Sequence, residues 1–184
     1  MAVQGAETTG VRPGAKRFSV LSLTLRMNGS QMDIKFRCAA PADLPAIVKM
    51  LCDDPLGATR ERFSEPLPES YTKAFKAIAA NPNNELIVAT RQSVPIGVMQ
   101  ITFIPYLTFQ GQWRAMVEGV RVHKSHREKG VGRRLIQEAV CRAEEKGCRL
   151  VQLTTDKKRP GALRFYESLG FIASHEGLKL HLNR

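Results

Sequence analysis

The segment from Trp113 to Gly147 constrains the fold more than any other part of the sequence. It begins with a strand-like stretch, passes through a short basic turn and continues into the clearest helical pattern of the chain, residues 130–146. The apolar residues of that pattern form one stripe: Val131, Leu135, Ile136, Ala139, Val140 and Ala143. Gly147 stands where helices commonly end. The segment therefore predicts a strand followed by a helix that packs on the sheet.

The remaining sequence predicts further strands and helices in a mostly alternating order. Strands are expected at residues 33–39, 85–90, 96–104, 113–122, 149–154 and 171–182. Helices are expected from Pro41 to about residue 51, and over residues 69–80, 130–146 and 162–169. The resulting order, β-α-α-β-β-β-α-β-α-β, indicates an α/β chain with a mixed sheet (α+β) that helices cover on both faces.

Residues 1–31 differ in composition from the rest of the chain. They contain one acid, Glu7, against four bases, Arg12, Lys16, Arg17 and Arg26. This composition is typical of an organellar transit peptide, but it also fits a disordered extension or a start codon placed too early. We expect a disordered N-terminal extension over residues 1–31 and one folded domain over residues 32–184.

Charge and cysteine content restrict the classes of partner and site. Lys and Arg number 28 against 17 Asp and Glu, a formal net charge of +11, which favours a polyanion or a phosphorylated small molecule as partner. The longest uncharged stretch, Gln92–Trp113, is broken by Pro and Gly, so no membrane span is expected. The four cysteines form no CxxC pair and the histidines add no ligand spacing. We predict reduced thiols, a cytoplasmic protein and no metal site.

The basic turn before the helix at residues 130–146 carries the chemistry. Gly130 and Gly132 stand at the helix start, where unpaired N–H groups and a partial positive charge favour a phosphate. Four bases surround them: Arg127, Lys129, Arg133 and Arg134. The R-x-x-G-x-G spacing is neither a nucleotide P-loop nor the three-glycine dinucleotide fingerprint. Close packing of the helix on a strand is the alternative interpretation of the two glycines.

A second motif follows the next predicted strand. It reads Arg164-Phe165-Tyr166-Glu167-Ser168-Leu169-Gly170-Phe171. Together the two motifs resemble the GNAT superfamily of N-acetyltransferases, over about residues 33–182. The resemblance implies the GNAT-like acyl-CoA N-acyltransferase fold, an N-acetyltransferase domain at residues 32–184 and acetyl-CoA as the co-substrate.

The resemblance also implies where the coenzyme binds. The pyrophosphate would lie on the backbone amides of the turn, formed by Arg127, Glu128, Lys129, Gly130, Val131, Gly132 and Arg133. The pantetheine arm would pair like an added strand with Val120, Arg121 and Val122, where the strands at residues 113–122 and 149–154 separate. Asp156 stands where the family often has Asn, and Phe165 is a further implied contact.

The implied reaction transfers the acetyl group to a primary amine of a small molecule by direct attack on the thioester. An amine with a pKa near about 10.4 needs a base, and the leaving thiolate needs a proton. Tyr166 matches the phenol that reaches the coenzyme sulfur, although it also fits a core aromatic. Glu118 is the candidate base, acting through a water, or an anchor for the substrate ammonium; a surface carboxylate is the alternative.

The acceptor pocket is expected between residues 52–68, the loop at 105–113 and the closing segment. The stretch from Thr155 to Arg159, with Tyr166 and His175, is similar to the aminoalkylphosphonate acetyltransferase branch. Lys157, Lys158 and Arg159 suit either an anionic acceptor or the 3′-phosphate of the coenzyme.

Other functions stay open at this stage. A protein or peptide amine is an alternative acceptor, and a non-catalytic acyl-CoA-binding domain or a basic nucleic-acid-binding domain is an alternative class. Aromatic residues make up only 7% of the chain and no nucleic-acid-binding motif is present, so no nucleic-acid or membrane partner is expected. The family also often forms homodimers.

Overall fold

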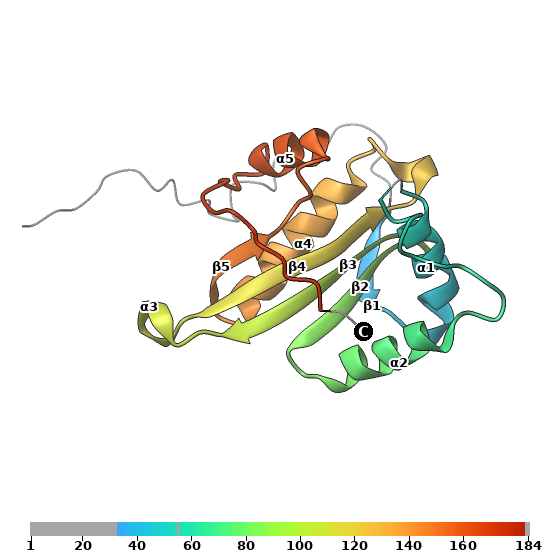
Figure 1. Ribbon diagram of the computed structural model, residues 1–184, viewed down its shortest axis with the longest axis horizontal. Coiled ribbons are helices and arrows are strands. Elements are labelled where there is room, and N and C mark those ends of the chain that lie inside the picture. Colours follow the sequence, from blue (N-terminus) through green and yellow to red (C-terminus); the bar gives the residue numbers. More distant parts are fainter. Residues whose placement is uncertain (1–32, 55, 183–184) are drawn as a thin grey trace, which may run out of the picture. The chain divides into compact units, whose positions relative to one another are not determined.

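The structure is a computed structural model that describes residues 33–54 and 56–182, so the expectation for residues 1–31 lies outside the described residues. Five strands form one sheet in the order β1-β2-β3-β4-β5 (Figure 1). They are β1 (Lys35–Cys38), β2 (Asn84–Arg91), β3 (Val94–Pro105), β4 (Trp113–Val122) and β5 (Cys148–Leu153). Neighbours from β1 to β4 run antiparallel and β5 runs parallel to β4. The predicted mixed sheet is confirmed.

The helices α1 (Leu44–Cys52), α2 (Glu69–Ala80) and α4 (Val131–Glu145) pack on this sheet, and α5 (Pro160–Glu167) lies against the start of α4. Short turns are η2 (Pro41–Asp43), α3 (Thr108–Gly111) and η3 (Lys124–His126). Two neighbours on β3 show how the layers lie. A Cβ on Gly97 would meet Leu135 and Val131 of α4, whereas Val98 packs with Ile47 and Met50 of α1.

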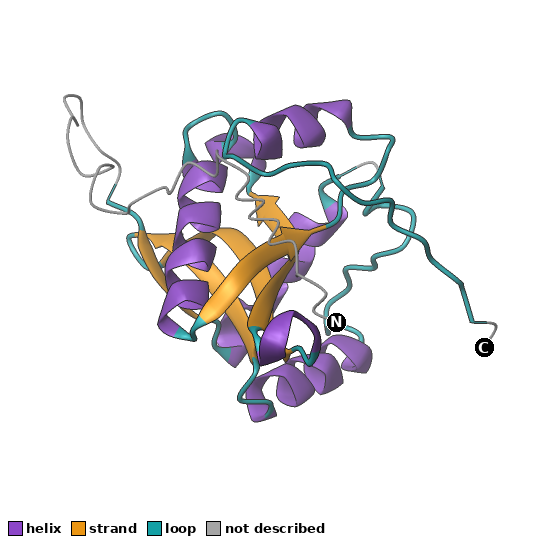
Figure 2. Cartoon of the chain, turned by 90° about the vertical axis from the view of Figure 1, so that its left-hand side faces the viewer, coloured by secondary structure: helices purple, strands orange, loops and turns teal. Residues whose placement is uncertain are grey.

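Because successive strand residues point to opposite faces, α1 and α4 cover opposite sides of the sheet (Figures 1 and 2). The two faces therefore bury different residues of the same strands. None of the helices in the described part of the chain is long and apolar enough to cross a bilayer.

The predicted closing strand over residues 171–182 is wrong. The described residues after α5 contain no strand, and the sheet ends at β5. Leu178, Leu180 and Leu182 alternate with polar residues in this segment, yet all three are exposed. A strand needs a neighbouring backbone as well as alternation, and this segment pairs with none of the described strands.

Asp43 joins β1 to the start of α1. Its buried carboxylate, in a residue only 6% exposed, accepts hydrogen bonds of 2.6 and 2.9 Å from the Arg37 guanidinium. The Ala40 N–H donates a further bond of 2.7 Å. The hydrogen bonds from Arg37 hold the pKa of Asp43 below its ordinary value, against the opposing effect of burial.

We expect Asp43→Asn to lower the free energy of unfolding by about 1–2 kcal/mol at pH 7, because it removes the charge that Arg37 contacts. Since the folded-state pKa of Asp43 is lowered, this stabilisation is full above the unfolded pKa of about 3.9 and is lost as the pH falls through the folded pKa. Urea unfolding at pH 7 and near pH 2 measures both values. The exposed Asp33 provides the control Asp33→Asn. If Asp43→Asn lowered the free energy of unfolding by the same amount in acid as at pH 7, the loss could not be assigned to the charge of Asp43.

Candidate functional site

The separation of β4 from β5 creates the site. The two strands pair only from Trp113 to Val117 on β4, opposite Cys148 to Leu153. Beyond Val117, the edge of β4 that faces β5 has no strand partner in the described part of the chain. The pairing of β4 with β3 shifts register between Val98 and Gln100, next to Gly119, whose φ is +60°. Such a bulge bends a strand and changes the direction of its side chains. The pairing of β4 with β5 ends at the last residue of β5, Leu153, so the final residues of β4 extend beyond it.

The turn between β4 and α4 presents a run of backbone donors. Gly130, the residue before α4, has a φ of +79°, a left-handed conformation that favours glycine. The first backbone bond across this turn joins the Arg134 N–H to the Gly130 carbonyl at 3.1 Å. Within residues 33–54 and 56–182, no group accepts a hydrogen bond from the N–H groups of residues 128–133. These amides can therefore bind an anion.

Gly132 differs from Gly130 in its surroundings. A Cβ at this position would lie 3.4 Å from Cζ of Phe165 and 3.8 Å from Cγ2 of Val122. These distances are ordinary van der Waals contacts, so a Cβ would fit between α4, β4 and α5, and packing alone does not require glycine at position 132. Phe165 in turn contacts Tyr166 edge-on, with ring centroids 5.1 Å apart.

The basic side chains of the turn are partly engaged within the protein. The Arg127 guanidinium donates to the Val122 carbonyl at 3.1 Å and to the Asp53 carbonyl at 2.7 Å. The Lys129 ammonium donates to the Ser125 carbonyl at 2.9 Å. These contacts brace the turn, whereas Arg133 is exposed. The backbone of the turn, more than these two side chains, is thus free for a ligand.

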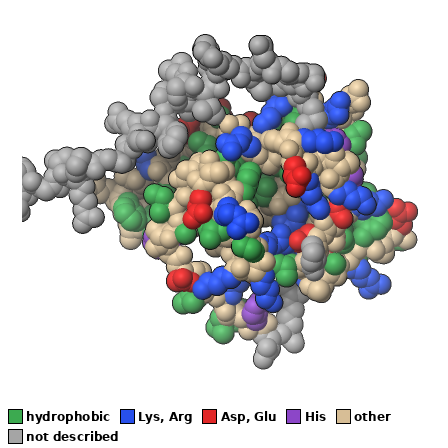
Figure 3. All heavy atoms as spheres, turned by 90° about the horizontal axis from the view of Figure 1, so that it is seen from above, with side chains coloured by type: hydrophobic (Ala, Val, Ile, Leu, Met, Phe, Trp, Pro, Cys, Tyr) green, Lys and Arg blue, Asp and Glu red, His purple; other side chains and the backbone are tan. Residues whose placement is uncertain are grey.

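A cavity of about 310 Å³ opens beside the end of β4. Its lining residues come from three segments: Val120, Arg121, Val122, Arg127, Asp54 and Arg159. Figure 3, which looks onto this end of the described domain, shows Lys and Arg side chains gathered around a hollow. The cavity brings together the predicted coenzyme residues of β4, the predicted Arg127 and an aspartate that the sequence analysis did not select.

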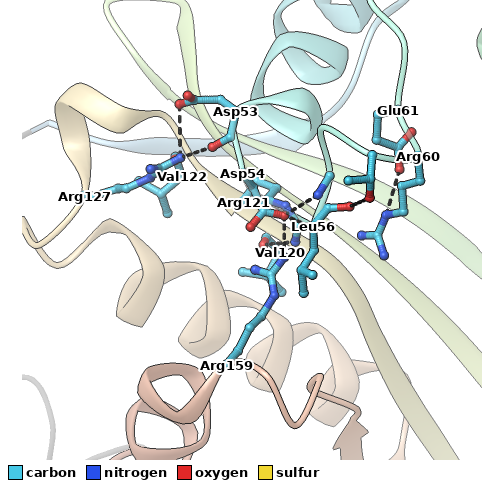
Figure 4. A network of polar contacts seen from close by, with 12 residues as sticks. Asp53, Asp54, Leu56, Arg60, Glu61, Val120, Arg121, Val122, Arg127 and Arg159 are labelled. Atoms are coloured by element: carbon cyan, nitrogen blue, oxygen red, sulfur yellow. Dashed lines mark hydrogen bonds and ion pairs between the residues drawn. The ribbon is translucent and has the colours of Figure 1, made fainter.

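Asp54 lies between two arginines (Figure 4). Its Oδ2 atom is 3.5 Å from the Arg121 guanidinium, accepts the Gly57 N–H at 3.0 Å and contacts the Arg159 guanidinium closely. Burial would raise the pKa of Asp54, but the hydrogen bond and charge of Arg159 and the other contacts outweigh it and lower the pKa. Asp54 is therefore an anion at neutral pH. The adjacent acids Asp53 and Asp54 at the end of α1 were the only sequence signal for it.

Tyr166 is half-buried on α5 and packs against Phe171, with ring centroids 5.9 Å apart. No described residue forms a hydrogen bond with its hydroxyl. Burial raises the pKa of Tyr166, while the charges of Arg121 and Arg159 oppose that rise. The phenol therefore keeps its proton at neutral pH, and two cations lie near enough to act on its charge.

The other two predicted carboxylates differ in their surroundings. Glu118 is exposed on β4, opposite Gln100 and next to the bulge, and no side chain in the described domain forms a hydrogen bond or ion pair with it. Asp156 accepts the Lys158 N–H on Oδ1 at 2.8 Å, so its carboxylate closes the turn between β5 and α5. Among the described residues, no group of His, Cys, Asp or Glu side chains could hold a metal ion.

The segments expected to wall the acceptor pocket lie at different distances from this cavity. Asp54 places the segment after α1 at the cavity. The loop at residues 105–113, by contrast, lies at the start of β4, and the seven residues of that strand before Val120 separate it from the cavity by about 23 Å. Of the three bases Lys157, Lys158 and Arg159, Arg159 lines the cavity. Lys157 instead forms an ion pair with Glu176 at 2.8 Å.

The comparisons with known proteins agree with this geometry. A model of the acetyltransferase (GNAT) family matches residues 49–171. The chain belongs to the GNAT acetyltransferase family. Among solved structures, a protein of Bacillus halodurans C-125 described as a transcriptional regulator is 56% identical to this GNAT protein. The match covers 81% of this chain and 99% of that one, with a TM-score of 0.79.

Two more distant structures support the GNAT fold alone. An acetyltransferase of Trypanosoma brucei is 24% identical over 82% of this chain and 100% of that one, with a TM-score of 0.64. The glucosamine-6-phosphate N-acetyltransferase of Arabidopsis thaliana is 14% identical over 82% of this chain and 99% of that one, with a TM-score of 0.66. No curated protein matches the chain.

We expect Gly130→Ala to lower the free energy of unfolding by about 1–2 kcal/mol, because an L-residue at a φ of +79° is strained. A Cβ at Gly130 would meet no atom within 4 Å, so conformation alone causes the loss. Thermal unfolding measures it. Gly161 is the matched control, because it also has open space but no positive φ; Gly161→Ala should be neutral or stabilising by up to about 1 kcal/mol. Equal effects of the two variants would contradict the interpretation.

Proposed function

We propose that this GNAT protein transfers the acetyl group of acetyl-CoA to a primary amine of a small molecule, by direct attack of the amine on the thioester. The observation that carries the proposal is the open edge of β4 at Val120–Val122, which leads through η3 to the unpaired amides of residues 128–133. An extended arm that ends in phosphates needs both features: strand-like pairing along one part and anion binding at the end.

The residues present fit that co-substrate. The backbone groups of Val120, Arg121 and Val122 would hold its pantetheine arm, and the N–H groups of residues 128–133 would hold its pyrophosphate. Acetyl-CoA supplies an activated acetyl thioester. The protein contributes orientation along β4 and, at the bulge, backbone donors for the negative charge that develops on the thioester oxygen.

Two side chains would move the protons. Tyr166 would give its hydroxyl proton to the departing sulfur, a role supported by its raised pKa and by a hydroxyl without a partner among the described residues. Glu118 would accept the proton of the acceptor ammonium through a water, or hold that ammonium, a role supported by its exposure beside the bulge. A neutral amine is needed for attack because its lone pair forms the new bond.

The class of acceptor and the assembly are further parts of the proposal. Similarity to the aminoalkylphosphonate acetyltransferase branch makes aminoalkylphosphonates one group of acceptors to screen, beside protein and peptide amines. Exposed leucines at positions 178, 180 and 182 support a homodimer in which this segment meets a second copy. A cytoplasmic location stays a prediction from the sequence.

Nucleic-acid binding is the second candidate function. It is favoured by the net charge of +11 and by the description of one relative as a transcriptional regulator. Against it, Arg121, Arg127 and Arg159 contact acidic side chains of the chain itself. Such internally paired arginines contribute little to a surface that binds phosphates of a nucleic acid.

Calorimetric titration of the purified protein with acetyl-CoA, and separately with ATP, tests the proposed function. We expect saturable one-site binding of acetyl-CoA and much weaker binding of ATP, because ATP has phosphates but no pantetheine arm to pair with β4. Equal binding of the two compounds, or no binding, would contradict the proposal. Binding of duplex DNA at physiological salt would then favour the second candidate.

Tyr166→Phe should lower kcat by about 10²-fold or more without weakening the binding of acetyl-CoA, because it removes only the donated proton. In the wild type this donor acts at neutral pH and is lost only as the pH rises above about 10, since the pKa of Tyr166 is raised. Glu118→Gln should instead lower kcat/KM, because it removes the carboxylate that would accept the proton of the acceptor ammonium or hold that ammonium. Steady-state thiol release across pH measures both variants, and an unchanged kcat for Tyr166→Phe would exclude the tyrosine as the acid.

A further inference from the structure

The cavity beside β4 contains more positive than negative side chains. Three of its lining residues are arginines, Arg121, Arg127 and Arg159, and one is an acid, Asp54. Arg127 has a separate partner, because its guanidinium lies 3.1 Å from the Asp53 carboxylate. Arg121 and Arg159 therefore share the single carboxylate of Asp54, and two guanidinium groups need more acceptors than one carboxylate provides.

Arg121 shows this shortage of acceptors most clearly. Its side chain is only 14% exposed, and its Nε is buried without a hydrogen-bond partner among the described residues. One terminal nitrogen donates to the Val120 carbonyl at 2.8 Å and the other is 3.5 Å from Asp54. Because a buried donor without an acceptor is costly, this guanidinium is set up to receive another anion.

We propose that Arg121 and Arg159 form a subsite for an anionic group of the amine acceptor, a carboxylate or a phosphoryl group. In the free protein the carboxylate of Asp54 occupies part of that subsite and competes with the incoming anion. The assignment to an acceptor rests on the proposed function. An anion between two guanidinium groups can receive paired N–H donors, the geometry in which arginine binds carboxylates and phosphates most strongly.

The position of Arg121 indicates that the anion bound at the subsite belongs to the amine acceptor, and not to the phosphates of the coenzyme. Arg121 is paired across the sheet with Val98, and residues paired in this way lie on the same face. Val98 packs against α1. The turn at residues 128–133 instead leads into α4, on the opposite face. The subsite thus lies on the α1 face of β4, where Glu118 also lies because its partner Gln100 is two residues from Val98.

The subsite also lies close to the proposed reaction centre. The charges of Arg121 and Arg159 both act on the hydroxyl of Tyr166. An acceptor that binds its anionic group between the two arginines would hold its amine a short chain length away, beside Tyr166 and Glu118. The subsite would therefore select amines that carry an anionic group a few atoms from the nitrogen.

Binding of inorganic phosphate and of acetate to the full chain, measured by calorimetry with saturating coenzyme A present, tests the subsite. Coenzyme A fills the amides of the turn and leaves the subsite as the remaining anion site. We expect Arg159→Gln to weaken phosphate binding at least about tenfold and Asp54→Asn to strengthen it. The control is Lys76→Gln, an exposed cation on α2, which should bind as the wild type does.

Three results would overturn the proposal. The first is phosphate binding that Arg159→Gln and Lys76→Gln change equally, which would indicate attraction to the general positive charge. The second is loss of phosphate binding when coenzyme A is added, which would assign the anion to the coenzyme's place. The third is no binding, or no gain for Asp54→Asn. If circular dichroism shows that Arg159→Gln is unfolded, Arg121→Lys replaces it, since it keeps the charge but loses the paired donors.

Acceptor kinetics separate this proposal from the proposed function. β-Alanine, 2-aminoethylphosphonate and propylamine are short primary amines that differ in their anionic group. We expect the first two to have a kcat/KM at least about tenfold above that of propylamine, with the advantage lost in Arg159→Gln. Equal rates for all three would exclude the subsite and leave the acetyltransferase function intact. Failure to bind acetyl-CoA would instead refute the proposed function.

Discussion

The early end of hydrogen bonding between β4 and β5 is the constraint on which the site depends. A backbone edge requires a partner, and the pairing of these strands stops at Val117 and Leu153. The residues that follow on β4 lead to a turn whose amides also have no acceptor in the described part of the chain. One continuous length of backbone therefore offers strand pairing and then anion binding, and this combination requires few particular side chains.

Around that backbone, the side chains serve mainly to hold loops in place. Arg127 connects the end of β4 to Asp53 after α1. Asp54 connects the same segment to Arg121 on β4 and to Arg159 before α5. Three segments far apart in the sequence thus meet through two aspartates. Because Arg159 precedes the helix that carries Tyr166, these ion pairs also help to position the proposed acid.

The sequence predicted the fold well where one local pattern decides the structure. The bounds of α2 and β4 match the expected ranges, and α2 ends at the run Asn81-Pro82-Asn83-Asn84, a local stop signal that needs no distant partner. The closing strand over residues 171–182 was wrong because a local pattern does not specify a partner strand, and the sheet ends at β5. Asp54 could not be found because its role depends on contacts with Arg121 and Arg159, 67 and 105 residues away. The sequence placed Gly130 and Gly132 together, but only the structure shows that the left-handed conformation is found at Gly130.

The structure shows where some of the excess positive charge lies. A charge of +11 suggests a polyanion when it is taken as a property of the whole chain. In the structure, Arg121, Arg127 and Arg159 converge on one cavity and are held there by acids. A surface that binds nucleic acid needs exposed cations spread over many phosphates, whereas convergent and partly buried arginines are suited to one small anionic group. The distribution of the charge, more than its sum, therefore favours a small-molecule ligand.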